Sequence, residues 1–155
     1  MSEVIVWRLC RQCYAEESYS GEGSRRFGGR WSSPGRKVAY SSESRSLAAL
    51  EVLVNVRDPS ILFREPWTLI AAKIPADLIE RPVRVPENWQ ATPYPPETQV
   101  FGDNWMEASL SAVLRVPSVV VLGEFNYLLN PAHADFKKIA ISKPEPFLFD
   151  SRFKL

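Results

Sequence analysis

The sequence holds few of the residues that metal centres and nucleophilic hydrolases require. It has one histidine, His133, and two cysteines, Cys10 and Cys13. A structural zinc site needs four ligands of these kinds, and the G-x-S-x-G motif of a common Ser-His-Asp hydrolase is absent. The C-x-x-C spacing also occurs in redox proteins, although reduced structural thiols are the more common case. We therefore expect no metal site and two reduced cysteines.

Long apolar runs and a strong charge imbalance are missing too. No stretch approaches the roughly 20 apolar residues of a membrane span, and residues 1–4 (MSEV) lack the basic and apolar regions of a signal peptide. The net charge is only +1, so no global field attracts nucleic acid. A chain of 155 residues with 45% hydrophobic residues fits one domain, residues 1–155. We expect a cytoplasmic protein that contacts neither membrane nor DNA directly.

Residues 21–51 form the most distinctive stretch, because glycines and arginines alternate in it before a short apolar helix that contains Glu51. Glycine lets a backbone approach a ligand closely, and the planar guanidinium suits phosphate or pyrophosphate. The stretch matches neither the Rossmann fingerprint nor the P-loop. It therefore predicts either a site for a nucleotide-sized anion or a set of solvated turns.

The remaining chain predicts alternating strands and helices without a regular βαβ rhythm. We expect strands near residues 4–9, 37–41, 69–74, 116–122, 137–142 and 146–149, and helices near 47–54 and 105–114. Residues 81–99 are rich in proline and predict a long irregular loop, a lid or a partner surface. Helical periodicity places Leu47, Leu50 and Val54 on the buried stripe, with Glu51 at its margin. The result is an α+β domain, with a mixed sheet and packed helices.

An ordered set of motifs over nearly the whole chain resembles the RES domain, a toxin family named after its Arg, Glu and Ser. The set comprises GEGSRRFGGRW (21–31), SPG (33–35), YSS (40–42), LAALEVLV (47–54), VPS (116–118), NP (130–131) and PFLFDSR (146–152). The resemblance implies a fold similar to ADP-ribosyltransferases, with NAD⁺ as a substrate rather than a bound cofactor. It also implies an Xre-type helix-turn-helix antitoxin as partner, DNA contact only through that antitoxin, and is compatible with a homodimer in a larger complex.

The resemblance also assigns residues to the site. The Arg, Glu and Ser of the family name fall on Arg30, Glu51 and Ser118, and the active-site Tyr falls on Tyr40. Substrate binding is expected from Arg30 and Tyr40, and from Arg8, Gly29 and Trp31. By itself, Arg8 in an apolar strand predicts either a side chain that reaches solvent or one that points into a pocket.

The chemistry of NAD⁺ is consistent with a single carboxylate. Ordinary glycosides need two carboxyl groups, one of which protonates the leaving oxygen, but nicotinamide leaves NAD⁺ as a neutral base. We hypothesise that Glu51 orients the ribose hydroxyls and stabilises the oxocarbenium-like transition state, and that Arg30 holds the pyrophosphate. Tyr40 is expected to stack on or position the nicotinamide ribose, and Ser118 to form a hydrogen bond inside the pocket rather than to act as a nucleophile. The function expected is NAD⁺ cleavage by hydrolysis or phosphorolysis. The alternatives are protein ADP-ribosylation and a non-catalytic partner of a DNA-binding protein.

Overall fold

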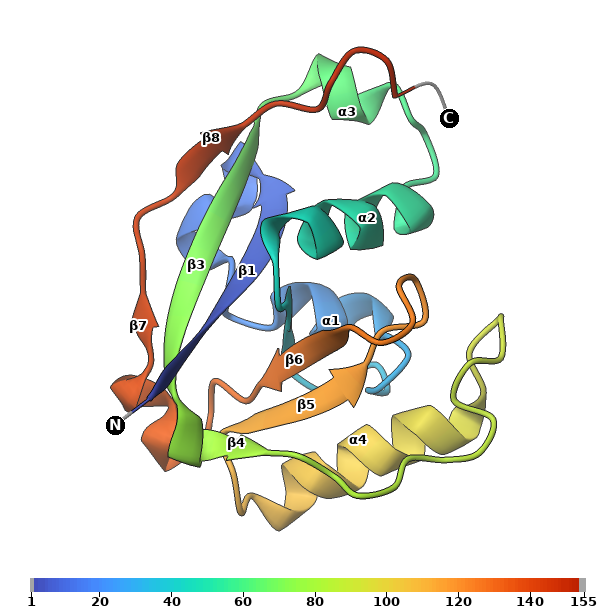
Figure 1. Cartoon of the computed structure of the whole chain (residues 1–155), viewed down its shortest axis with the longest axis vertical. Helices are drawn as coiled ribbons and strands as arrows, with labels where there is room; N and C mark the ends of the chain where they lie inside the picture. The colour runs from blue at the N-terminus through green and yellow to red at the C-terminus, as the bar shows by residue number, and fades with distance from the viewer. Residues whose placement is uncertain (1, 154–155) are drawn as a thin grey trace.

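The computed structural model describes residues 2–153, so residues 1, 154 and 155 of the expected domain lie outside the described part. An eight-stranded mixed sheet has the order β4-β5-β6-β2-β1-β3-β7, and β8 also pairs with β3 (Figure 1). Every strand pairing is antiparallel except that of β4 with β5. The structure is the α+β domain with a mixed sheet that the sequence predicts. The strands are β1 (Glu3–Arg11), β2 (Ala39–Ser42), β3 (Trp67–Pro75), β4 (Ile79–Glu80), β5 (Val113–Pro117), β6 (Phe125–Leu129), β7 (Ala140–Ile141) and β8 (Glu145–Phe147).

The sheet is divided at its middle. Strands β1 and β2 meet at a single register position, Trp7 opposite Ser42. In contrast, β1 pairs with β3 from Glu3 to Arg11, and all of β2 pairs with β6. Two halves therefore fan apart from one junction, and Figure 1 shows the steep pair β1 and β3 diverging from β5 and β6. Backbone groups of β1 and β2 beyond the junction are left free to bind side chains instead of each other.

Four α-helices flank this sheet, and each starts where its local sequence favours a helix. The hydroxyl of Ser44 caps α2 by accepting a hydrogen bond from the Leu47 amide at 3.0 Å. Helix α4 begins with Pro96, whose missing N–H is not needed in a first turn. Among residues 2–153, no helix combines the length and apolar character needed to span a bilayer. The helices are α1 (Glu22–Phe27), α2 (Arg45–Asn55), α3 (Ile61–Arg64) and α4 (Pro96–Ala108), with 3₁₀ helices η1 (Gln12–Glu17), η2 (Ala76–Leu78) and η3 (Ala134–Lys138).

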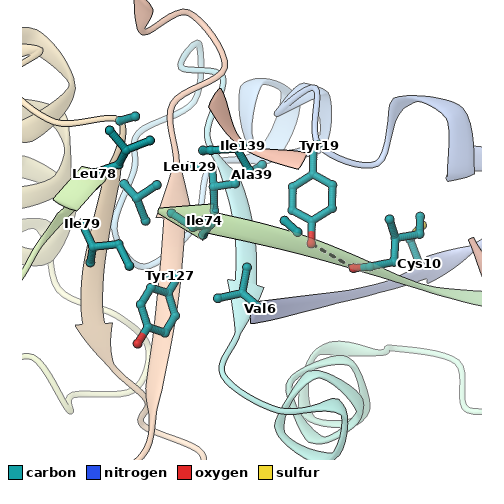
Figure 2. Packing of buried hydrophobic residues seen from close by; sticks show 14 residues of the cluster. Val6, Cys10, Tyr19, Ala39, Ile74, Leu78, Ile79, Tyr127, Leu129 and Ile139 are labelled. Atoms are coloured by element: carbon teal, nitrogen blue, oxygen red, sulfur yellow. Dashed lines mark hydrogen bonds between the residues drawn. The ribbon is translucent and has the colours of Figure 1, made fainter. Parts of the chain in front are cut away.

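Buried side chains form three clusters on the two faces of the sheet. The largest includes Val6, Ile74 and Leu129, and in it the Tyr19 hydroxyl donates to the Ile70 carbonyl at 2.9 Å (Figure 2). The second joins α2 to β1 and β3 through residues such as Leu53. The third lies under α4 and contains Trp31, Val38, Trp105, Leu114, Val116 and Leu128. Because strand β3 is covered by clusters on both faces, nearly all of it is buried.

Several predicted boundaries are wrong, and turn chemistry explains the clearest of them. The apolar run at residues 116–122 was expected to be a strand, but β5 ends at Pro117. The Ser118 hydroxyl accepts hydrogen bonds from the amides of Val120 and Val121, at 3.1 Å each. These bonds replace a strand ladder with a turn, and Gly123 completes it with a φ of 92°. The chain then returns as β6.

The helices also differ from their predicted positions. The helix expected at residues 105–114 spans Pro96–Ala108, so only residues 81–95 of the proline-rich segment are irregular. The stripe predicted on α2 is rotated, because the helix packs through Leu47, Ala48 and Leu53 against β1 and β3. Leu50 and Val54 are exposed instead. Periodicity identified the helix but not the side that faces the sheet, since residues on several faces of α2 are apolar.

Candidate active site

Glu51 lies on α2 and reaches across to the other half of the sheet. Its Oε2 atom accepts a hydrogen bond from Ser118 Oγ at 3.0 Å and from Asn126 Nδ2 at 2.7 Å. Ser118 directly follows β5, and Asn126 lies on β6. Glu51 is half-buried, as expected, although the helix stripe from which this was inferred is rotated. A helix from one side of the split sheet thus presents an anion to the strands of the other side.

Ser118 is fully buried, and its hydrogen bonds leave its hydroxyl with one role, that of a donor to Glu51. Its two acceptor positions are filled by the Val120 and Val121 amides, so its single proton is the one donated to Glu51. An attacking oxygen needs a free lone pair, and this one has both occupied. The geometry therefore favours Ser118 as a donor to the carboxylate over Ser118 as a nucleophile.

The Tyr40 phenol is bound to the turn that contains Gly29. Its oxygen accepts a hydrogen bond from the Trp31 amide at 3.0 Å and is bonded to Ser32 Oγ at 2.9 Å. A Cβ atom at residue 29 would lie 2.7 Å from this oxygen, so only glycine fits there. Burial raises the pKa of Tyr40 to about 12, so the folded protein favours the neutral phenol up to a higher pH than the unfolded chain does.

The raised pKa of Tyr40 has a measurable consequence at high pH. Since the folded state prefers the neutral phenol, Tyr40 contributes its full stability below the unfolded pKa of about 10, and this contribution is lost as pH rises toward 12. Tyr40→Phe should lower the free energy of unfolding by about 1–3 kcal/mol at pH 8, because the Trp31 amide and Ser32 lose a partner. We expect the difference between the two proteins, measured by urea unfolding, to shrink from pH 10 to 12. A constant difference in the free energy of unfolding over this range would contradict the raised pKa of Tyr40.

Arg8 lies in β1, just beyond the junction of the two sheet halves. Its Nη1 atom donates to the Tyr40 carbonyl at 2.9 Å, while its buried Nε has no hydrogen-bond partner in residues 2–153. Burial lowers its pKa, and no described carboxylate lies within ion-pair distance. Arg8 is half-buried as a residue, but a guanidinium with a buried, unsatisfied donor and no counter-ion among residues 2–153 is a place where an anionic ligand would be stabilised.

Arg30 holds the proline-rich segment. Its Nη1 donates to the carbonyls of Trp89 and Ala91 at 2.8 and 2.6 Å, and its guanidinium lies 5.8 Å from the centre of the Tyr94 ring. Burial lowers its pKa, while the negative charge of Glu51 acts in the opposite direction. Arg30 is therefore near enough to Glu51 for their charges to interact, and it ties the segment to the site.

Helix α4 also holds the Gly29–Ser32 turn in place. Gln99 Nε2 donates to the carbonyls of Gly29 and Ser32 at 3.2 Å each, and the Trp31 indole packs edge-on against Phe101. Trp31 as a whole is only 3% exposed, so its indole belongs to the cluster under α4. Gly29, by contrast, is half-buried, and its neighbour is the Tyr40 phenol.

The structure thus gathers Glu51, Ser118, Tyr40, Arg30 and the residue 29–32 turn at the split of the sheet, with Arg8 bonded to Tyr40. Sequence analysis missed two further members, Ser42 and Asn126. One signal was available for Asn126, since this polar residue interrupts the apolar run FNYLL of β6. A hollow of about 380 Å³ between η1, β3 and β8 is lined by none of these side chains.

The fold and this arrangement describe a small α+β domain with one carboxylate held at the opening of a divided sheet. Residues 5–150 match the RES domain, and the chain belongs to that family. It is 35% identical to "Toxin Res" of Yersinia enterocolitica, over 97% of this chain and 100% of the relative. It is 40% identical to "Toxin Res" of Photorhabdus laumondii, over 96% of each. A "Prs ADP-ribosylating toxin" of Sphingobium sp. is 33% identical over 94% of each.

A solved structure has the same fold. The chain superposes with a TM-score of 0.75 on a chain of the crystal structure of the M. tuberculosis MbcT-MbcA toxin-antitoxin complex. The alignment covers 95% of this chain and 85% of that chain, at 17% sequence identity. An identity this low establishes a shared fold and no shared activity.

Proposed function

We propose that this chain is the toxin of a toxin–antitoxin pair and that it cleaves the nicotinamide–ribose bond of NAD⁺. The observation that carries the proposal is one held carboxylate, Glu51, at the split of the sheet. The guanidinium of Arg30 is near enough for their charges to interact, and Arg8 in β1 has a buried Nε with no partner in residues 2–153. A dinucleotide offers a complementary distribution of charge, anionic at the pyrophosphate and cationic at the nicotinamide. The relatives named as toxins, one of them as an ADP-ribosylating toxin, support the same proposal.

In the proposed mechanism Glu51 acts on the transition state. As the bond to nicotinamide breaks, the electron pair leaves with the ring nitrogen and positive charge develops on the ribose. The ionised carboxylate of Glu51 stabilises that charge, and its hydrogen bond from Ser118 already holds it in place. The departing ring is neutral, so the reaction needs no general acid and no second carboxyl group. Tyr40 supports the turn that borders the ribose through the hydrogen bonds of its phenol to Trp31 and Ser32.

The two arginines would share the pyrophosphate. Arg8 has a buried Nε without a partner in residues 2–153, while Arg30 gives Nη1 to the carbonyls of the proline-rich segment. Arg30 retains its Nε–H, and its contact to the Thr92 hydroxyl is long, at 3.5 Å. We therefore assign the main phosphate contact to Arg8, with Arg30 joining it from the side of the segment.

Arg8→Gln should weaken NAD⁺ binding by about 10–100-fold, the range expected when a charge-assisted hydrogen bond is lost. Arg8→Lys should recover part of the affinity, since it restores the charge without the planar donor pair. The measurement is KM for NAD⁺ together with Kd by calorimetry. Arg11→Gln is the matched control, because Arg11 lies on the same strand but pairs with Glu65 at 2.9 Å. Equal Kd values for the wild type and Arg8→Gln would remove Arg8 from the site.

The test of the function is a product assay on purified protein incubated with NAD⁺. Release of nicotinamide, quantified by chromatography, supports cleavage, and its absence under all conditions contradicts the proposal. The second product identifies the acceptor. Free ADP-ribose indicates water, a phosphorylated ADP-ribose that appears only with inorganic phosphate indicates phosphorolysis, and label from ³²P-NAD⁺ on a protein indicates ADP-ribosylation. The last outcome is the second candidate function, favoured by the name of the Sphingobium relative.

For the partner, we propose an Xre-type antitoxin that also carries the DNA contact. The similarity in fold to a chain of a toxin–antitoxin complex supports an antitoxin, and the net charge of +1 argues against direct DNA binding. Growth arrest upon expression, relieved by co-expression of the neighbouring gene, would support this pairing. A chain that never affects growth, yet binds the partner, would instead be a non-catalytic module.

A further inference from the structure

We propose that Asn126, oriented by Ser42, is a positioning residue that reserves one oxygen of Glu51 for the substrate. The inference rests on the proposed function, and Asn126 lies outside both residues 21–51 and the motifs shared with the RES domain. The hydrogen bonds to Glu51 are distributed unevenly over its two carboxylate oxygens.

Both donors to Glu51 end on the same oxygen. Ser118 Oγ and Asn126 Nδ2 both donate to Oε2, at 3.0 and 2.7 Å, while Oε1 accepts no hydrogen bond from residues 2–153. A carboxylate has room for about four such bonds, two on each oxygen. Two donors arriving from different strands fix the plane of the carboxylate, and they leave its other oxygen entirely to a ligand.

The amide of Asn126 can serve this role in only one orientation. A flipped amide would set its oxygen against the Glu51 carboxylate, which has no proton to donate, so Nδ2 faces Glu51. The Ser42 hydroxyl then donates to Oδ1 at 2.8 Å and holds the opposite side of the amide in place. Ser42 is only 4% exposed and lies at the junction where β1 meets β2. The orientation of the carboxylate is thereby linked to the most constrained point of the sheet.

This arrangement has a specific catalytic value. A carboxylate that is already oriented needs no reorganisation when positive charge develops on the ribose, and preorganisation of this kind acts in the transition state. Oε1 can then accept a ribose hydroxyl or face the reacting carbon, while Oε2 stays bound to the protein. Removing Asn126 should therefore lower kcat and leave NAD⁺ affinity nearly unchanged.

The experiment compares Asn126→Ala, Asn126→Asp and Ser42→Ala in the nicotinamide-release assay. Asn126→Ala should lower kcat by about 10–100-fold with KM within about threefold, and Ser42→Ala by a smaller factor. Asn126→Asp adds a carboxylate beside Glu51, so the acid limb of its pH–rate profile should move to higher pH. Asn55→Ala is the matched control, because Asn55 bonds to the main-chain carbonyl of Glu51, at 2.7 Å, and not to its carboxylate.

A double-mutant cycle separates positioning from a general structural role. If Asn126 acts through Glu51, then adding Asn126→Ala to Glu51→Ala should not lower the residual single-turnover rate further. Equal kcat for the wild type and folded Asn126→Ala, or additive losses in the cycle, would overturn the inference while the proposed function stands. If Asn126→Ala does not fold, the other two variants take its place. A wild-type rate for Ser42→Ala together with an unshifted pH profile for Asn126→Asp would then overturn the inference. A wild type that releases no nicotinamide defeats the proposed function, and the inference with it.

Discussion

Glu51→Gln is expected to reduce nicotinamide release by about 10²–10³-fold while the protein stays folded, since this is the typical cost of removing one group that stabilises transition-state charge. The glutamine oxygen can still accept hydrogen bonds from Ser118 and Asn126, so the two donors keep a partner. What is lost is the negative charge facing the ribose. NAD⁺ affinity, measured by calorimetry, should change much less than kcat.

The matched control for this substitution is Glu124→Gln. Glu124 is also half-buried and lies on the turn between β5 and β6 close to Ser118, but its side chain makes no hydrogen bond to the residues gathered around Glu51. It should retain the wild-type rate. If Glu51→Gln keeps more than about a tenth of the wild-type kcat, Glu51 does not stabilise transition-state charge. The mechanism proposed above would then be wrong.

Gly102→Ala is the second substitution for which we expect a large effect. Alanine ordinarily favours a helix over glycine by about 1 kcal/mol, but a Cβ atom at residue 102 would overlap the carbonyl of Trp31. That carbonyl belongs to the turn that Tyr40 and Gln99 hold, so it cannot move without disturbing the site. We expect a loss of about 3 kcal/mol in the free energy of unfolding, measured by urea denaturation, and reduced activity.

Gly23→Ala provides the comparison, because Gly23 also lies in a helix, α1, and a Cβ atom there would meet nothing within 4 Å. Helix propensity alone then applies, and the protein should gain up to about 1 kcal/mol. Opposite signs for the two substitutions would confirm that the approach of α4 to Trp31 is the cause. A stabilising Gly102→Ala would mean that α4 and the residue 29–32 turn are not in contact.

The agreement between sequence and structure is best where the signal is local. The presence of a helix at α2 and of the apolar strand β3 follows from residue type and spacing. The predictions fail where tertiary contacts outweigh the local pattern. Val119 to Leu122 have the composition of a strand, but the Ser118 hydroxyl binds the amides of Val120 and Val121. The face of α2 that packs was missed because Leu50 and Val54 are as apolar as Leu53.

The sequence by itself determined the class of fold and the family, and it predicted the residues of the candidate site, because composition, periodicity and short motifs are properties of neighbouring residues. Only the tertiary structure decided how those residues meet. It gave Glu51 two donors on one oxygen, left the buried Nε of Arg8 without a partner in residues 2–153, turned Trp31 into the core and added Asn126 and Ser42. Each of these depends on contacts across the divided sheet between residues far apart in the chain, and spacing along the sequence does not encode such contacts.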